Sequence, residues 1–250
     1  MNVGQETTAM SRLQPARRTM VFRKLLWVLL APTVWLACLG AAAAAPLRVA
    51  IAGDVWLRHK QQPSALHYAA PLFRRADVAI VNLEGPLTAR TQRTPNKSAR
   101  DLQRHYHFVL RADPRAATDL RDAGVDVVGL ANNHLMDYRT GGCLDTIRAV
   151  RRLGLATTGA GVNIGAARAP AFVRTRQGTV AVLAYLAFMS PGGRAACTPA
   201  GAKSAGVAIV RPNGAGTALS DSSRQAVARD IGAARRRAGA VIVMFHWGTE

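Results

Sequence analysis

Short runs rich in valine and isoleucine alternate with segments of helical character along most of this 250-residue chain. The first part of the pattern predicts three strands and three helices, in the order strand 47–53, helix 64–76, strand 77–85, helix 113–124, strand 125–133 and helix 140–154. Strands this uniformly apolar need cover on both faces, which a sheet obtains when helices connect its parallel strands. The order therefore predicts an α/β fold with a mostly parallel sheet.

The second part of the chain uses a different strand connection. Residues 171–188 contain two strand-like runs joined by a short polar turn, which is typical of a hairpin. A loop rich in Gly, Pro and Ser is expected at residues 189–206. A helix is expected at residues 220–239, and residues 240–250 are interpreted as a last buried strand with a polar tip.

Four of the predicted strands end in a cluster of polar residues. The sequences are GDVWLRH after the first strand, NLEGPLT after the second, ANNHLMD after the third and HWGTE after the last. In parallel α/β sheets, ligand sites form beyond the carboxyl ends of the strands, because loops converge there on a rigid frame. The candidate site residues are Asp54, Asn82, Glu84, Asn133, His134 and His246.

These six side chains combine carboxylate, amide and imidazole groups, and they include no thiolate. Such a set suits borderline to hard divalent cations such as Mn, Zn or Fe. A centre of one or two such ions would activate water for attack on phosphorus or carbon. The sequence therefore predicts a divalent-metal site at the strand ends and leaves the identity of the metal open.

Each of these residues also has an ordinary structural interpretation. Asp54 could be a turn or capping residue, Asn82 and Asn133 could occupy turns, and His134 could cap the next helix. We expect Asp137 to be the N-cap of the helix that follows rather than a ligand. The other histidines of the chain lie in surface-like stretches, where we expect solvated roles: His59, His67, His105 and His107. The joint position of the six candidates at strand ends is what favours a metal site.

The amino-terminal 45 residues have the layout of a secretory signal peptide. A basic flank at Arg23 and Lys24 precedes an apolar run at residues 25–40, and small residues lead to a cleavage position near Ala45. Met20 fits as the start of such a signal. The run is short for a membrane span, and an uncleaved amino-terminal anchor is the alternative. We therefore expect an exported protein that is periplasmic, extracellular or anchored at the cell envelope.

The chain is strongly basic, with 33 Lys and Arg against 14 Asp and Glu and a formal net charge of +19. Five bases and one acid fall within residues 1–45, so a charge of +15 stays with the rest of the chain. A charge of this size favours an anionic partner. Nucleic acid is a poor candidate, because export is predicted and aromatic residues for base stacking make up only 6% of the chain.

Two cysteines, Cys143 and Cys197, lie beyond the predicted signal. Outside the cytoplasm they could form a disulfide, and two unpaired, semi-buried thiols are the alternative. The sequence leaves both open, because it does not show whether the two residues are close enough to pair.

Five motifs occur in the order GDVWL, NLEGPLT, ANNHLMDY, TGAG and HWGTE. This succession resembles CapA-type capsule synthesis proteins, the poly-gamma-glutamate synthesis family whose domain is similar to calcineurin-like metallophosphatases. The resemblance runs from about Leu47 to Glu250, and the combination of NNH with HWG is its most specific part. It implies a metallophosphatase-like β-sandwich flanked by helices.

Carried over residue by residue, the resemblance implies metal-site positions at Asp54, Asn82, Glu84, Asn133 and His246. It implies that His134 is a ligand or an acid beside the leaving group. Trp247 and Arg139 are expected to contact the substrate, and Arg139 stands where the family usually has glycine after the tyrosine of its NNHxxDY motif.

The family also expects a later histidine loop of the GHHPH kind, after a further helix and strand, whereas this sequence stops at Glu250. An α/β sheet that stops there would leave a strand edge exposed. The resemblance therefore predicts that residues 47–250 are the N-terminal part of a CapA-like domain, incomplete at its C-terminal end.

Three functions fit these observations. The first is a secreted, metal-dependent, hydrolase-like component of poly-gamma-glutamate capsule synthesis or export, with the anionic polymer and the membrane capsule-synthesis machinery as partners. The second is a phosphoesterase that uses the same site on a periplasmic phosphate ester. The third is a non-catalytic basic protein that holds an anionic polymer at the envelope.

Overall fold

The computed structural model describes residues 45–57, 64, 66–105, 107–187, 197–214 and 218–247. Residues 46–250 form one compact unit, distinct from residues 1–45. The predicted signal peptide or anchor lies outside the described residues, as does His59. In the part of the chain that is described, no helix is both long and apolar enough to cross a bilayer.

The first sheet contains four parallel strands in the order β1-β2-β3-β4. They are β1 (Val49–Val55), β2 (Val78–Leu83), β3 (Val127–Gly129) and β4 (Ala156–Thr158). Every residue of β2 is buried, because the strand has neighbours on both sides and is covered on both faces. This sheet confirms the parallel arrangement predicted from the strand and helix order.

The second sheet contains three strands in the order β6-β7-β9. Strands β6 (Ala171–Thr175) and β7 (Gly178–Leu186) form the predicted antiparallel hairpin, and β9 (Ala240–His246) pairs with β7 in parallel. All seven residues of β9 are only partly buried, so the expectation of a buried last strand is wrong. The reason is that β9 pairs on one side only among the described strands and forms the edge of its sheet.

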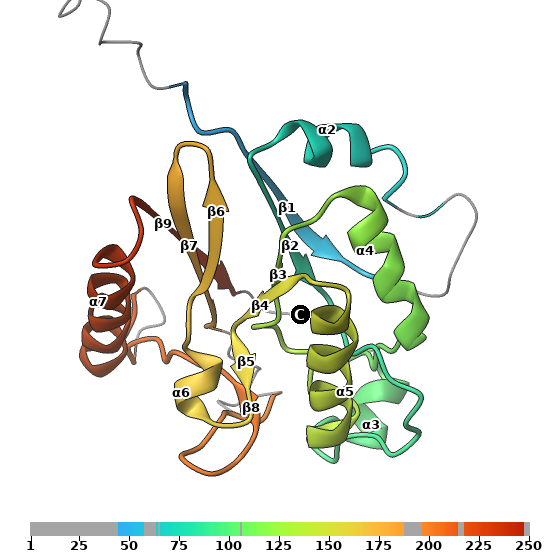
Figure 1. Ribbon diagram of the computed structural model, residues 1–250. Coiled ribbons are helices and arrows are strands. Elements are labelled where there is room, and N and C mark those ends of the chain that lie inside the picture. Colours follow the sequence, from blue (N-terminus) through green and yellow to red (C-terminus); the bar gives the residue numbers. More distant parts are fainter. Residues whose placement is uncertain are drawn as a thin grey trace, which may run out of the picture. The chain divides into compact units, whose positions relative to one another are not determined.

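The two sheets pack face to face, with helices on the outer face of each (Figure 1). Helices α2 (Ala70–Arg75), α4 (Ala117–Ala123) and α5 (Arg139–Arg152) pack against the first sheet, and α7 (Asp221–Arg235) packs against the second. The layer between the sheets is apolar and includes Val78, Ile80, Val127, Val180 and Val182. This arrangement confirms the predicted β-sandwich flanked by helices.

Local sequence explains where the main helices begin and end. Helix α2 starts at Ala70 rather than at residue 64, because Pro71 lacks the N–H that a preceding helical turn would need. The side chain of Asp113 accepts a hydrogen bond from the Arg115 N–H at the start of a 3-10 turn, η1 (Pro114–Ala116), which leads into α4. Helix α4 ends at Gly124 in the left-handed conformation, at φ 89°.

Several short elements were not predicted from the sequence. They are α3 (Ala99–Gln103), β4 (Ala156–Thr158), β5 (Ala160–Gly161), α6 (Ile164–Ala167) and β8 (Gly206–Val207). Elements of two to five residues are too short to show a periodic pattern.

The two cysteines of the unit are buried and unpaired. This is the alternative to the disulfide, and burial raises the pKa of the Cys143 thiol to about 12. Both thiols are therefore packing groups rather than nucleophiles in this structure.

Candidate metal centre

A bulge in β1 determines the face on which Asp54 lies. Pairing with β2 runs residue by residue from Val49 to Ala52 and then skips Gly53, so that Asp54 lies opposite Asn82. Because side chains alternate along a strand, the extra residue places Asp54 on the same face as Asn82 and Val55 in the core on the helix side. Asp54 thereby faces the second sheet.

Three potential metal ligands converge at this end of the two sheets. One atom each of Asp54, Glu84 and His246 lies within 4.8 Å of the others. Nδ1 of His246 is 3.5 Å from Oδ1 of Asp54 and 3.9 Å from Oε2 of Glu84. Asp54 comes from β1 and Glu84 from the position after β2, in the same sheet, whereas His246 ends β9 of the other sheet, so His246 reaches the two carboxylates only because the two sheets pack together.

The cluster opens to solvent on one side. The Asp54 side chain is 55% exposed, whereas that of Glu84 is 11% exposed. A hollow of about 260 Å³ adjoins the cluster and is lined by both sheets, with Ile51 and Asp54 on one wall and residues 242–246 on the other. A small ion or water molecule can therefore reach the carboxylates from this side.

His246 is oriented by Asn133, one of the predicted ligands. Nε2 of His246 lies 2.9 Å from the side-chain oxygen of Asn133, and an amide oxygen can only accept a hydrogen bond. Nε2 therefore carries the proton, and Nδ1 presents its lone pair to Asp54 and Glu84. Asn133 is placed to orient a ligand from outside, as hydrogen-bond partners of metal-binding histidines do.

Asn82 lies at the centre of the cluster, but it presents its amide nitrogen. This nitrogen donates to Asp54 Oδ1 at 2.6 Å and to Glu84 Oε2 at 2.8 Å, and it lies 3.4 Å from His246 Nδ1. A positively polarised NH₂ group thus occupies the point toward which the three ligand atoms are directed. Binding of a metal through the Asn82 oxygen requires the side chain to rotate.

Asn132, which was not among the candidates, fixes this orientation of Asn82. Its side-chain nitrogen donates to Asn82 Oδ1 at 3.1 Å and to the Leu83 carbonyl at 2.7 Å. Its oxygen accepts from the backbone N–H groups of His134 and Leu135. Because these backbone partners define which end of Asn132 is the donor, they also define which end of Asn82 faces the carboxylates.

Glu84 titrates close to neutrality in the absence of a metal. Burial raises the pKa of its carboxyl from 4.5 to about 7, an effect that His134 opposes and the neighbouring Asp54 charge adds to. A cation bound between the two carboxylates would favour the ionised form. The site therefore concentrates negative charge that a divalent ion can stabilise.

His134 lies behind Glu84 and contacts it through one ring nitrogen. Its Nε2 is 3.8 Å from Glu84 Oε1, and its Nδ1 is 2.8 Å from Asp137 Oδ2. The ring is buried, with the side chain 6% exposed. His134 is thus held between the cluster on one side and a carboxylate on the other.

Asp137 is not the N-cap of α5, so that expectation is wrong. Tyr138 occupies the cap position and makes no side-chain cap bond, while the Asp137 carboxylate accepts from the Leu110 N–H at 2.7 Å. Asp137 also forms an ion pair with Lys97, whose Nζ is 2.7 Å from Oδ1, and both side chains are fully buried. The buried carboxylate faces this cation instead of the helix end, because burying its charge without a partner would be costly.

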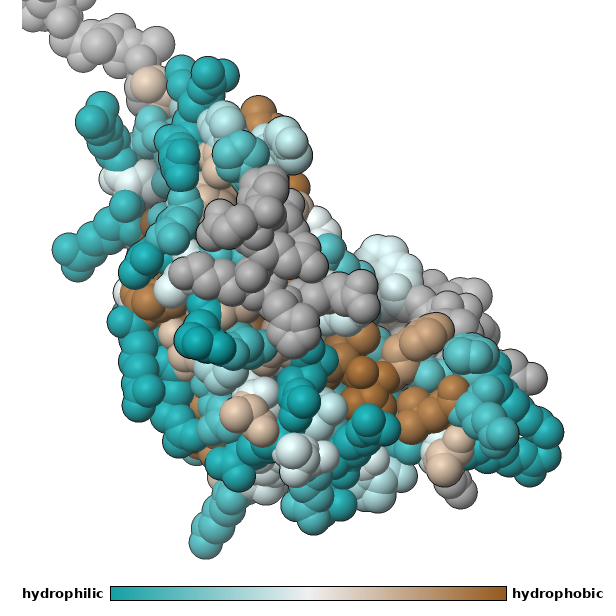
Figure 2. All heavy atoms as spheres, turned by 90° about the vertical axis from the view of Figure 1, so that its right-hand side faces the viewer, coloured by the Kyte–Doolittle hydropathy of each residue, from teal (hydrophilic) through white to brown (hydrophobic). Residues whose placement is uncertain are grey.

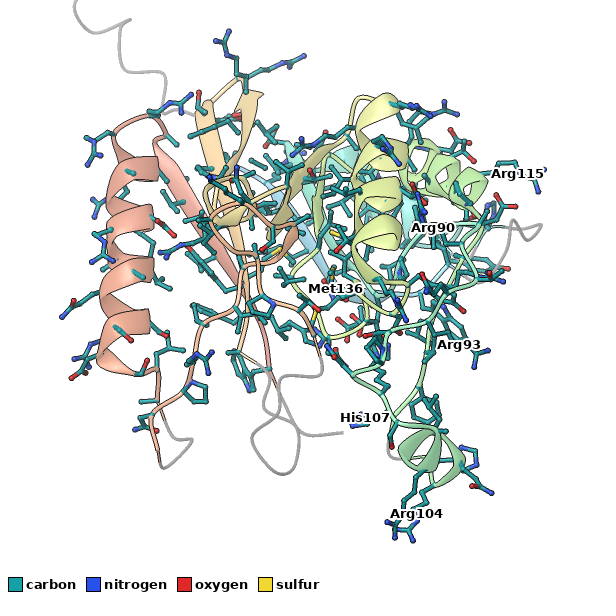
Figure 3. All side chains as sticks on the ribbon, turned by 90° about the horizontal axis from the view of Figure 1, so that it is seen from below. Arg90, Arg93, Arg104, His107, Arg115 and Met136 are labelled. Atoms are coloured by element: carbon teal, nitrogen blue, oxygen red, sulfur yellow. The ribbon has the colours of Figure 1, made fainter. Side chains whose placement is uncertain are left out.

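Lys97 comes from residues 88–111, which we call the excursion. Its two ends are joined where Leu87 pairs with Ala112, and its described part includes α3. Figure 3 shows Arg93 and Arg104 on this projecting part of the chain, with Met136 of the site loop farther inside. The excursion therefore starts and returns beside the loop that carries His134 and Asp137.

The predicted substrate contacts differ in their positions. Trp247 follows His246 and is 73% exposed, so it lies beside the cluster with its ring open to solvent. Arg139 starts α5, and its Nε donates to the Arg93 carbonyl at 2.8 Å rather than facing the cluster. Of the histidines expected at the surface, His67 and His105 are exposed. His107 is partly buried.

Two carboxylates and an imidazole at the strand ends of a four-layer α/β/β/α sandwich define a candidate metal-binding domain of the metallophosphatase-like class. Sequence comparison gives the family. The chain belongs to the bacterial capsule synthesis protein family PGA_cap, whose family model matches residues 48–250.

Individual relatives carry names that refer to capsule or polymer synthesis. The chain is 27% identical over 192 residues to the PGA biosynthesis protein CapA of Bacillus subtilis (strain 168), covering 76% of this chain and 44% of the relative. It is 26% identical over 125 residues to the capsule biosynthesis protein CapA of Bacillus anthracis, covering 47% and 29%.

A third relative comes from Mycobacterium tuberculosis (strain ATCC 25618 / H37Rv). It is described as a probable polyglutamine synthesis accessory protein and is 29% identical over 178 residues, covering 70% of this chain and 42% of the relative. The chain thus spans less than half the length of each of these three relatives.

Proposed function

We propose that this chain binds a divalent cation through Asp54, Glu84 and His246. We further propose that it acts as a metal-dependent, hydrolase-like component of poly-gamma-glutamate capsule synthesis or export at the cell envelope. The observation that carries the proposal is the convergence of three ligand atoms within 4.8 Å from three separate strand ends. Mn, Zn and Fe suit this set of oxygen and nitrogen donors.

The residues present fit such an ion. The NH₂ group of Asn82 already lies between both carboxylates and Nδ1 of His246, so the cluster is built around a positively polarised centre. Asn133 holds His246 in the tautomer that directs a lone pair inward. When bound, a divalent cation would supply Lewis acidity toward water and toward a phosphoryl or carbonyl oxygen.

The chain itself supplies proton-handling and positioning groups. His134 can hold or release a proton at Nε2, on the side facing Glu84. Asp54 is half exposed at the mouth of the site, so a substrate enters next to a ligand rather than through the core.

The basic surface supports an anionic polymer as partner. Helices α4 and α5 expose Arg121, Arg148, Arg151 and Arg152, and the face of the unit on their side is largely hydrophilic (Figure 2). A surface of this sign attracts a polyanion such as poly-gamma-glutamate, with a strength that falls as salt is added. The names of the relatives support the same polymer.

Metal titration of matched variants tests the proposal. We expect Mn or Zn to bind the wild-type chain in isothermal titration calorimetry, and binding to be lost in Asp54→Ala and His246→Ala. Asp221→Ala and His105→Ala replace exposed residues of the same types and serve as controls. If wild type and site variants bind the ion equally, the ligand assignment is wrong.

Two functional assays separate the proposed role from its alternatives. In a producing strain, His246→Ala is expected to reduce polymer synthesis or release, which a general phosphoesterase role does not predict. Turnover of an aryl phosphate with Mn and not with chelator favours the phosphoesterase. Salt-sensitive binding of poly-gamma-glutamate that survives both chelator and His246→Ala indicates the non-catalytic binding protein.

A further inference from the structure

Among the residues that the structure describes, Lys97 is the only buried lysine or arginine. Its side chain is fully buried, and its Nζ lies 2.8 Å from the Phe108 carbonyl, 2.7 Å from Asp137 Oδ1 and 3.0 Å from His134 Nδ1. A lysine is rarely buried this completely, because its charge needs full compensation. The three contacts place that compensation at Asp137, next to the imidazole of His134.

Asp137 is where the excursion meets the loop that carries His134. Its backbone carbonyl accepts from the Thr94 N–H at 2.8 Å, and its Oδ2 accepts from the Leu110 N–H at 2.7 Å. Lys97 adds the ion pair to Oδ1 and, through the Phe108 carbonyl, connects the two arms of the excursion. The carboxylate is therefore held from both arms, with Oδ2 directed at His134.

We infer that Lys97 is a positioning residue of the site. It holds the Asp137 carboxylate so that Oδ2 accepts the Nδ1–H of His134, and this directs Nε2 toward Glu84. The inference has two parts. The geometric part, that Lys97 and Asp137 fix the proton of His134 on Nδ1, does not depend on a metal. The functional part, that this arrangement supports metal binding, rests on the proposed metal centre.

Chemistry decides which atom carries the proton. An ionised carboxylate can only accept, so a distance of 2.8 Å between Asp137 Oδ2 and His134 Nδ1 requires the proton to be on the nitrogen. Lys97 lies slightly farther from the same nitrogen, at 3.0 Å; it donates to the Phe108 carbonyl and forms an ion pair with Asp137 Oδ1. In the opposite assignment, Lys97 donates to His134 Nδ1 and the ring proton is on Nε2. Nδ1 and Asp137 Oδ2 would then be two acceptors 2.8 Å apart.

Nitrogen NMR of the histidine rings tests the geometric part. In ¹⁵N-labelled wild-type chain with chelator, we expect the long-range ¹H–¹⁵N pattern of His134 to show the proton on Nδ1. Lys203→Met makes the same change at an exposed lysine and should leave the pattern unaltered. Lys97→Met should change it.

The double variant Lys97→Met/Asp137→Leu keeps the test valid if Lys97→Met alone does not fold, because it removes both buried charges together. In this variant we expect the proton to move to Nε2. A wild-type spectrum with the proton on Nε2 overturns the inference. So does a double variant that keeps the proton on Nδ1, or a folded Lys97→Met with an unchanged spectrum.

A double-mutant cycle tests the functional part. Loss of a direct partner of a metal ligand typically costs about 10–100-fold in metal affinity, and Lys97 acts on the ligand Glu84 only through Asp137 and His134, so Lys97→Met should weaken Mn binding by about 10-fold, the lower end of that range. In a His134→Gln background the same change should have little further effect, because Lys97 acts through His134. An equal loss in both backgrounds shows a merely structural role. If wild-type chain binds no Mn, the proposed function fails, and the NMR result alone decides the positioning role.

Discussion

Glu84→Gln should remove the pH dependence of stability that the buried carboxyl creates. Burial raises the pKa of Glu84 from 4.5 to about 7, so the folded chain binds this proton more tightly than the unfolded chain does. Between these two pH values the folded state therefore holds more protons, and the free energy of unfolding falls as pH rises. Above pH 7 the full cost of the ionised, buried carboxylate is present.

The size of the effect follows from the shift. Each pKa unit corresponds to about 1.4 kcal/mol, so a rise from 4.5 to about 7 amounts to roughly 3 kcal/mol between pH 4.5 and pH 8. Glutamine is close in shape to the protonated carboxyl and does not ionise. We therefore expect Glu84→Gln to match wild type near pH 4.5 and to be more stable by about 3 kcal/mol at pH 8.

Urea denaturation with chelator, repeated from pH 4.5 to 8, measures this difference directly. All other titrating groups are common to both chains, so their contributions cancel in the comparison. Asp221→Asn changes an exposed carboxylate and controls for the loss of one negative charge. A stability difference between wild type and Glu84→Gln that stays constant across this pH range would refute the reasoning.

Three other changes have defined outcomes. Mn affinity of the wild-type chain should fall as pH drops below about 7, because the proton on Glu84 competes with the ion, and titration calorimetry at several pH values will show whether it does. Asn133→Ala should weaken Mn binding by about 10–100-fold with little loss of stability, since it removes the group that orients His246; an unchanged affinity contradicts that role. Gly159→Ala should lower the unfolding free energy by more than about 2 kcal/mol, because φ is +90° there and a Cβ would lie 2.7 Å from that of Ala131. Gly232→Ala in α7, where a Cβ has open space, is its control in thermal melts.

The layer arrangement was predictable because it depends on patterns that are local in sequence. Continuous Val and Ile in residues 78–83 indicate a strand covered on both faces, and helix ends at Asp113 and Gly124 depend on capping chemistry within a few residues. The partial exposure of β9 does not follow from its own residues, which are as apolar as those of β2, but from its place at the edge of its sheet among the described strands.

The site was predictable in its position but not in its hydrogen bonding. The rule that polar strand ends converge places Asp54, Glu84 and His246 together, and one ligand atom of each lies within 4.8 Å of the others. The donor direction of Asn82 depends on the hydrogen bonds that Asn132 makes, and although Asn132 belongs to the NNH motif, the motif does not indicate its hydrogen-bond partners.

Lys97 was not among the candidate site residues, because its partner Asp137 is 40 residues away in the sequence. One signal was available in the composition. Only four of the 33 basic residues in the chain are lysines. A lysine in a chain that otherwise uses arginine is a reason to consider a specific role for that residue.

The bulge at Gly53 has a consequence for how β1 tolerates changes of length. Deleting Gly53 would make the pairing regular and leave Asp54 opposite Asn82, on the side of the second sheet. Inserting one residue between Gly53 and Asp54, with the bulge kept, would instead place the new residue opposite Asn82 and turn Asp54 toward the helix side. The carboxylate would then be lost to the site although every ligand residue was still present, so a one-residue insertion acts like a ligand substitution and a one-residue deletion does not.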